Sequence, residues 1–352
     1  MWKVLLAVML ALPGSNARAV PGPTPEAVLA LPAELRARLH DEVIAGTHSR
    51  TRRFERLVAF MFEPRGLGMR YRAEPTPTVS EAYASRQANC LGFTLLFLAL
   101  AHEAGIEAHP REIRDTLSWE QKEGTIYRAA HVNAGVRLGG RQFVVDVAGP
   151  DIVAAHRPQR ITERELMAHY YNNRAVEQLM QGDIEGAIAQ SRHALELDPR
   201  NSAHWSNAGV LQLRRGDAAA AGRHYAKALA LDSREAGALF NQVNLCRRLR
   251  DAGCEMQYRN RLQRVRRGDP FHHYLLASDL ARRGDFANAI AHYRRAIQRH
   301  GDEPRFHAAL AQTYRDSGDT LRAQRAEARA TALRNRIEDE NERARAAVLG
   351  RD

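Results

Sequence analysis

The chain has 352 residues, of which 44% are hydrophobic and 26% charged, so it can bury an ordinary core, and its length fits two domains better than one. The formal net charge is +11, and clustered arginine would favour a nucleic-acid partner. The basic residues are instead spread through predicted helices beside glutamate and aspartate. This pattern indicates a solvated surface and argues against nucleic-acid binding.

The N-terminus has the pattern of a secretory signal peptide. Lys3 precedes an apolar run, Val4–Leu12, and a polar stretch that ends at Ala19. The apolar run stops at Pro13, well short of the roughly 20 residues that cross a bilayer, and no later segment is long and apolar enough. We therefore expect that cleavage after Ala19 removes residues 1–19. The mature chain is expected to be periplasmic or secreted and to have no transmembrane anchor.

Residues 20–166 mix helix and strand signals, which predicts an α+β domain. Ser80 is placed to cap a short helix, and Cys90 begins a strongly apolar helix that ends near Gly105. At a helix N-terminus the dipole and the free amides favour a thiolate and can bind an oxyanion. Cys90 is therefore a candidate nucleophile, although a buried structural thiol is the commoner role of a cysteine beside an apolar helix.

A β-hairpin is predicted farther along the same domain. Two alternating runs, residues 130–136 and 142–147, flank the glycine pair Gly139-Gly140. Pairing about this turn brings His131 and Asp146 close together, because they lie eight and six residues from it. A carboxylate beside a histidine fixes its tautomer and stabilises the imidazolium. Taken alone, His131 is more simply a structural strand residue.

A helix-opening cysteine, a histidine on a later strand and an aspartate fifteen positions after it together resemble the transglutaminase-like superfamily, in particular the bacterial SirB1-type proteins that carry tetratricopeptide repeats. The segment 86–90 reads Arg-Gln-Ala-Asn-Cys, where the family usually has glycine in place of Ala88. The resemblance spans about residues 75–150 and implies a papain-like core. It also implies that Cys90 is the nucleophile, His131 the general acid/base and Asp146 the orienting carboxylate.

The oxyanion site is less clearly marked in the sequence. The backbone amide of Cys90 is the first candidate, and the side chain of Gln87 or Tyr83 is a second. The remaining histidines show no metal-ligand spacing, and no glycine-rich phosphate loop occurs. We therefore expect neither a metal nor another cofactor.

The second half, residues 168–335, repeats with a period of 34. Gly-Asp pairs begin at positions 182, 216, 284 and 318, and Arg250-Asp251 occupies the missing place. This pattern resembles the tetratricopeptide repeat, a helix-turn-helix unit of that length. It predicts five units stacked into an all-α superhelix, the third being degenerate, with Glu255 and Leu262 where its neighbours carry alanine. Residues 336–352 read as a charged tail, expected to be a fraying or solvent-capping helix.

Two of the three cysteines, Cys246 and Cys254, fall in the third unit, on either side of its turn. Their spacing allows a disulfide in an oxidising compartment. Two buried free thiols are an equally good interpretation, because cysteine also packs as a small apolar residue.

Together these features predict an exported cysteine-nucleophile acyl-transfer enzyme, acting as a peptidase, amidase or transglutaminase on a peptide or protein held in the repeat groove. The first alternative is a non-catalytic interaction adaptor, in which the repeats bind a protein partner and the transglutaminase-like fold is a scaffold. The second is a basic module that binds anionic envelope polymers.

Overall fold

The computed structural model describes residues 22–113, 119–122, 125–128, 131–147 and 158–349. The predicted signal peptide, residues 1–19, lies outside these ranges. Within them, no helix combines the length and apolarity that a membrane span requires.

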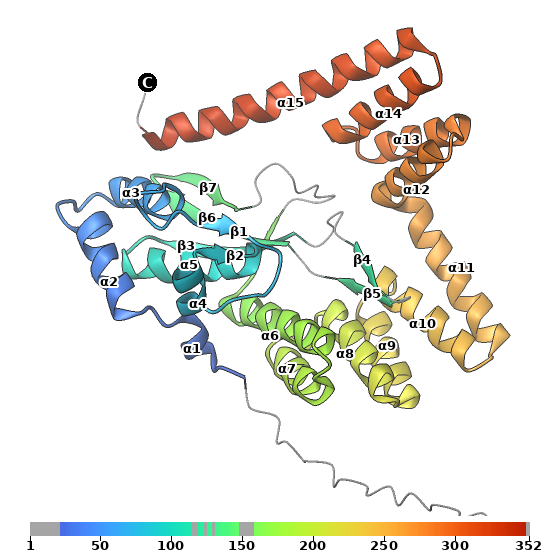
Figure 1. Ribbon diagram of the computed structural model, residues 1–352, viewed down its shortest axis with the longest axis horizontal. Coiled ribbons are helices and arrows are strands. Elements are labelled where there is room, and N and C mark those ends of the chain that lie inside the picture. Colours follow the sequence, from blue (N-terminus) through green and yellow to red (C-terminus); the bar gives the residue numbers. More distant parts are fainter. Residues whose placement is uncertain (1–21, 114–118, 123–124, 129–130, 148–157, 350–352) are drawn as a thin grey trace, which may run out of the picture.

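Helices precede and flank a small sheet in the first half of the chain (Figure 1). The helical elements are α1 (Pro25–Leu29), α2 (Ala33–Leu39), the π-helix η1 (His40–Ile44), α3 (Arg50–Phe62), α4 (Val79–Ser85) and α5 (Cys90–Glu103). The strands are β1 (Arg70–Tyr71), β2 (Gln87–Ala88), β3 (Ala108–Ile113), β4 (Trp119–Lys122), β5 (Thr125–Arg128), β6 (His131–Leu138), β7 (Arg141–Val145) and β8 (Gln159–Arg160).

The central sheet is antiparallel with the order β7-β6-β3-β8. The predicted hairpin is present as β6 and β7, in which Ala134 faces Val145 and Leu138 faces Arg141. Gly139 and Gly140 both have positive φ, +54° and +77°, as a tight two-residue turn between right-twisted strands requires. Helix α5 packs on β3 and β6, with α3 and α4 against it. Other elements cover α5 on most of its surface, which agrees with the apolar residues on all of its faces.

Five antiparallel helix pairs form the second half. They are α6 (Glu163–Met180) with α7 (Ile184–Leu197), α8 (Ser202–Arg215) with α9 (Ala218–Leu231), α10 (Ala236–Arg248) with α11 (Ala252–Gly268), α12 (Pro270–Arg282) with α13 (Phe286–Arg299), and α14 (Pro304–Asp316) with α15 (Thr320–Leu349). The repeated Gly-Asp pair makes four of the five turns, because the glycine takes positive φ and the aspartate caps the second helix.

The third unit departs from its neighbours as its sequence indicates. Arg250 replaces the turn glycine and still adopts φ +58°, a conformation that favours glycine. Glu255 remains near the surface in ion pairs with Arg247 and Arg259, and Leu262 is the buried residue of α11. Helix α11 contacts α12 sparsely, whereas α9 packs along α10 and α13 along α14. Stacking is therefore weakest after the degenerate unit.

The boundary expected at residues 166–168 falls inside α6 (Figure 1). Leu166 and Tyr170 of this helix belong to the same buried cluster as Leu35 and Phe97 of the first half. The prediction failed here because one face of α6 packs in the α+β core while another packs on α7. The first repeat is thus part of both halves.

Two other segments join the halves. The β4–β5 hairpin lies against α8 and α10, where Figure 1 places it beside the repeats. The tail from residue 336, predicted as a capping helix, continues α15 as far as Leu349. Figure 1 shows α15 running back over the first half, and α15 contacts α3.

Candidate functional site

Cys90 is the first residue of α5 and is half-buried. The side chain of Asn89 caps the helix, because its Oδ1 accepts a hydrogen bond of 2.9 Å from the amide of Gly92. The amides of Cys90 and Leu91 precede the first intrahelical bond, so the helix itself provides no acceptor for them. The nucleophile candidate therefore lies at the positive end of a buried helix.

His131 and Asp146 lie on the adjacent strands of the hairpin. His131 begins β6, and Asp146 directly follows Val145, the last residue of β7. The His131 Nε2 atom donates to Asp146 Oδ2 at 2.7 Å, and the two side chains are 4% and 17% exposed. A bond this short between largely buried groups fixes the orientation of the imidazole ring.

The third member of the set, Cys90, lies close enough to the His131 ring to raise its pKa. Since Nε2 is used by Asp146, the nitrogen available to the Cys90 sulfur is Nδ1. The hydroxyl of Thr94 reinforces this arrangement, because it reaches the carbonyl oxygens of Cys90 at 2.7 Å and of Val132 at 3.3 Å. Helix α5 and strand β6 are thus tied together beside the two reactive groups.

These contacts change the titration of His131. Burial alone would lower its pKa, but hydrogen bonds to Asp146 and Cys90 and the charges of both outweigh burial and raise the pKa to about 9. At neutral pH the ring is therefore an imidazolium. The cationic ring thus lies between the Asp146 carboxylate and the Cys90 side chain.

One polar residue of this cluster is absent from the sequence prediction. Asn133 is buried on β6, and its Nδ2 donates to Asp146 Oδ2 at 3.1 Å, so the oxygen that binds His131 has a second donor. Its position gave a usable signal: it is a polar residue in an apolar strand, two positions from His131 and therefore on the same face.

The proposed oxyanion side chains differ in what they bind. The Tyr83 hydroxyl donates to Glu34 Oε1 at 2.8 Å, which directs its proton away from Cys90 and does not support the prediction for Tyr83. Gln87 lies on β2, and its Oε1 accepts from Arg72 at 3.1 Å. With its oxygen held, the Gln87 amide nitrogen keeps donors for a ligand.

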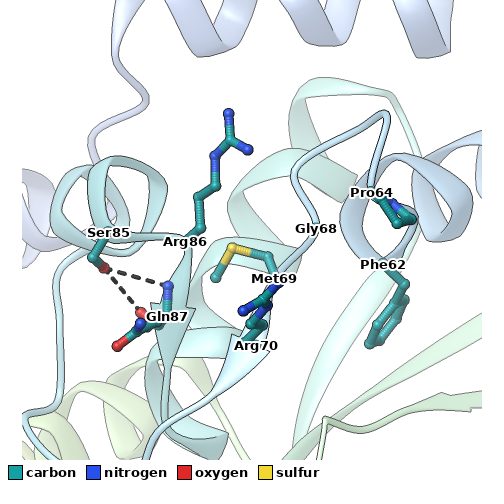
Figure 2. A pocket seen from close by; sticks show the side chains of 8 residues that line it. All are labelled: Phe62, Pro64, Gly68, Met69, Arg70, Ser85, Arg86 and Gln87. Atoms are coloured by element: carbon teal, nitrogen blue, oxygen red, sulfur yellow. Dashed lines mark hydrogen bonds between the residues drawn. The ribbon is translucent and has the colours of Figure 1, made fainter.

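A cavity of about 370 Å³ opens beside Gln87 (Figure 2). Its lining combines apolar and basic side chains: Phe62, Pro64, Gly68, Met69, Arg70, Ser85, Arg86 and Gln87. Figure 2 shows Ser85, Arg86 and Gln87 on one side and Met69, Arg70 and Phe62 on the other. Cys90 is not among the lining residues. The cavity lies next to the strand that leads into the nucleophile.

The alanine at position 88, where the resemblance expects glycine, fits its surroundings. Ala88 lies in the extended strand β2, so no glycine conformation is required there. The residue that must lack a side chain here is Gly92. A Cβ on Gly92 would lie 2.6 Å from Pro77 Cδ and 3.3 Å from Ala88 Cβ. Ala88 therefore does not disturb the turn before Cys90.

The other two cysteines are bonded to each other. The structure joins Cys246 and Cys254 across the turn of the third unit, with Cα atoms 5.7 Å apart, a normal separation for a disulfide. Cys90 is the remaining free thiol of the three. Among the described residues, no group of three or more histidine, cysteine, aspartate or glutamate side chains is arranged to hold a metal ion.

Comparison with known proteins identifies the helical half. Two family models, each described as a tetratricopeptide repeat, match residues 168–201 and 272–313. These are the first and fourth units, on either side of the degenerate third. Comparison with curated proteins finds no match.

Solved structures that resemble the chain include MamA, with 18% identity and a TM-score of 0.28, covering 49% of this chain and 94% of that one. YrrB, described as a TPR protein with an unusual peptide-binding site, has 18% identity and a TM-score of 0.27, covering 47% and 86%. PilF from Pseudomonas aeruginosa has 19% identity and a TM-score of 0.29, covering 53% and 90%.

The family matches cover two of the repeats, whereas a papain-like architecture for the first half stays a prediction. Repeats of this kind stack into extended concave surfaces that bind other proteins, so a protein-interaction role follows from them. The chain contains an array of tetratricopeptide repeats, joined to an α+β first half that holds Cys90, His131 and Asp146 together.

Proposed function

We propose that the protein is a cysteine-dependent acyl-transfer enzyme whose substrate is a peptide or protein carboxamide or peptide bond. The observation that carries this proposal is the grouping of Cys90, His131 and Asp146, in which Asp146 hydrogen-bonds to His131 at 2.7 Å and the His131 pKa is raised to about 9. The order and spacing of these residues resemble the transglutaminase-like superfamily, and the proposal includes the papain-like core that this resemblance implies.

The geometry supports the following chemistry. The Cys90 thiolate attacks the carbonyl carbon, and the carbonyl oxygen becomes an oxyanion near the first-turn amides of α5. Collapse breaks the C–N bond as the His131 imidazolium protonates the leaving amine, which leaves a thioester on Cys90. His131, now neutral, removes a proton from an incoming water or amine. Attack by that nucleophile releases the acyl group and restores the Cys90–His131 pair.

Hydrolysis is the simpler outcome, because water is the most abundant acyl acceptor. Deamidation and cross-linking follow the same steps and differ in the acyl donor and the acceptor. In this proposal Asp146 orients the ring and stabilises its cation, and the amide of Gln87 is a candidate second oxyanion donor. The repeats would hold the protein that carries the scissile amide.

We also propose that the protein acts after export. The predicted signal peptide supports this, as does the Cys246–Cys254 bond, because disulfides persist in oxidising compartments.

The second candidate function is a non-catalytic adaptor. The match of two units to tetratricopeptide-repeat models favours it, because protein binding by the repeats requires no reaction at Cys90. The two candidates differ in whether Cys90 accepts an acyl group.

A burst experiment with a p-nitrophenyl ester of an acylated glycine separates them. The enzyme proposal predicts the release of about one nitrophenol per chain in a rapid first phase and an acyl adduct on Cys90 by mass spectrometry. Cys90→Ala should lose both signals, and His131→Ala should lose the rapid phase. Equal, slow release by the wild type and both variants would support the adaptor and overturn the enzyme proposal.

A further inference from the structure

A hydrogen-bonded chain runs from the first repeat to the cap of the nucleophile helix. It begins at Glu177 on α6, passes through Thr76 in the loop before α4, and ends at Asn89, the residue before Cys90. Glu177 and Thr76 are separated by 101 positions in the sequence. Neither residue belongs to the reacting set described above.

Thr76 is the centre of this chain and is fully buried. Its backbone amide donates to Glu177 Oε1 at 2.6 Å. The hydroxyl oxygen in turn accepts from Asn89 Nδ2 at 2.7 Å. Thr76 thus joins the two sides: its amide binds the Glu177 carboxylate, and its hydroxyl oxygen binds the Asn89 amide.

Asn89 transmits this anchoring to α5. Its Nδ2 is held by Thr76 and by the carbonyl of Ala73 at 3.3 Å, which leaves Oδ1 directed at the amide of Gly92. The cap therefore has one orientation, and the Asn89–Cys90 peptide is fixed with it.

The repeat side of the chain is also firmly held. Arg174 on α6 donates to Glu177 Oε2 at 2.8 Å, and Asn173 donates to the Thr76 hydroxyl at 3.4 Å. Burial raises the pKa of Glu177, while the bonds from Thr76 and Arg174 act in the opposite direction. Burying a carboxylate costs free energy of desolvation. We therefore look for a role in the geometry that the bonds of Glu177 enforce.

We propose that Glu177 of the first repeat is a positioning residue for Cys90 and acts through Thr76 and Asn89. The proposal rests on the assignment of Cys90 as the nucleophile. The first repeat then has two roles: it begins the protein-binding array, and it sets the position of the reacting thiol. Helix α6 would then contribute both to the repeat surface that binds the substrate and to the position of Cys90.

The test compares full-length variants that alter one link each. Glu177→Gln keeps the shape and removes the charge, Thr76→Val removes the hydroxyl, and Thr76→Ser restores it. Glu185→Gln is the matched control, because Glu185 is an exposed glutamate of the same repeat. Two readouts are followed: hydrogen exchange at the Gly92 amide, and the pH profile of Cys90 alkylation by iodoacetamide.

We expect Glu177→Gln and Thr76→Val to speed Gly92 exchange at least about five-fold. The alkylation profile should move upward by about half a pH unit or more, because a displaced thiol loses part of its contact with the imidazolium. Thr76→Ser and Glu185→Gln should match the wild type in both readouts.

Three other results would each contradict the inference. Faster Gly92 exchange with an unchanged alkylation profile would reduce Glu177 to a support of the fold. No change in either readout would show that Glu177 does not act on α5. The enzyme proposal would still stand in that case if the wild type shows the burst at Cys90. A wild type whose Cys90 accepts no acyl group would remove the enzyme proposal and this inference with it.

Discussion

The stability that the substitution Asp146→Asn removes should depend on pH, because the His131 pKa in the folded wild type is raised. In the folded chain the His131 pKa is about 9, against about 6.5 for an unperturbed histidine. A raised pKa means that the folded state binds the proton more tightly than the unfolded state. The resulting stabilisation is complete below pH 6.5 and is lost as the pH rises through about 9.

The size of the effect follows from the same shift. About 2.5 pH units correspond to about 3 kcal/mol of folding free energy. Asparagine cannot supply the charge, so the Asp146 contributions that oppose burial are lost and the His131 pKa falls, although the contribution of Cys90 remains. The variant should therefore be less stable than the wild type by up to about 3 kcal/mol at pH 6, with a much smaller difference at pH 10.

Urea unfolding at the two pH values measures this difference, and an NMR titration of the His131 ring reports its pKa directly. Asp302→Asn is the control, because Asp302 is exposed and pairs with Arg336 at the surface. It should change stability little, and equally at both pH values. A stability difference for Asp146→Asn that is the same at pH 6 and pH 10, with an unchanged His131 titration, would refute the reasoning.

Three further predictions concern the turn, the helix start and the disulfide. Arg250→Gly should raise the free energy of unfolding by about 0.5–1 kcal/mol, because glycine relieves the positive φ of Arg250, and thermal denaturation would show it. Gly92→Ala should lower the free energy of unfolding by about 1–3 kcal/mol in urea titrations, because the new Cβ would lie 2.6 Å from Pro77 Cδ. Replacing Cys246 and Cys254 together by serine should cost about 2–3 kcal/mol, the value expected for closing so short a loop, and intact mass should show that reduction adds two hydrogens to the wild type only.

The features that the sequence predicts well are those set by local chemistry. The 34-residue period places the turns correctly, because a glycine at positive φ and an aspartate at the next N-cap act within a few residues. The hairpin follows for the same reason, since alternation and the Gly139-Gly140 pair fix its register. That register carries Asp146 to His131, so the pair could be anticipated without the fold.

The features that were missed depend on contacts between distant residues. Glu177 reads as an ordinary helix glutamate, and only the packing of α6 on the first half brings it to Thr76. The boundary near residue 167 failed for the same reason, because periodicity shows that a helix is present but not that two of its faces are buried by different partners. The docking of β4–β5 against α8 and α10 is likewise tertiary.

The most direct test of the central claim is the rate at which iodoacetamide alkylates Cys90 at neutral pH in the wild type, His131→Ala and Asp146→Asn. The proposed function predicts fast alkylation in the wild type and a fall of at least about ten-fold in both variants, because each loses the imidazolium that stabilises the thiolate. Slow alkylation that neither substitution changes would contradict the proposal and leave protein binding by the repeats as the function of the chain.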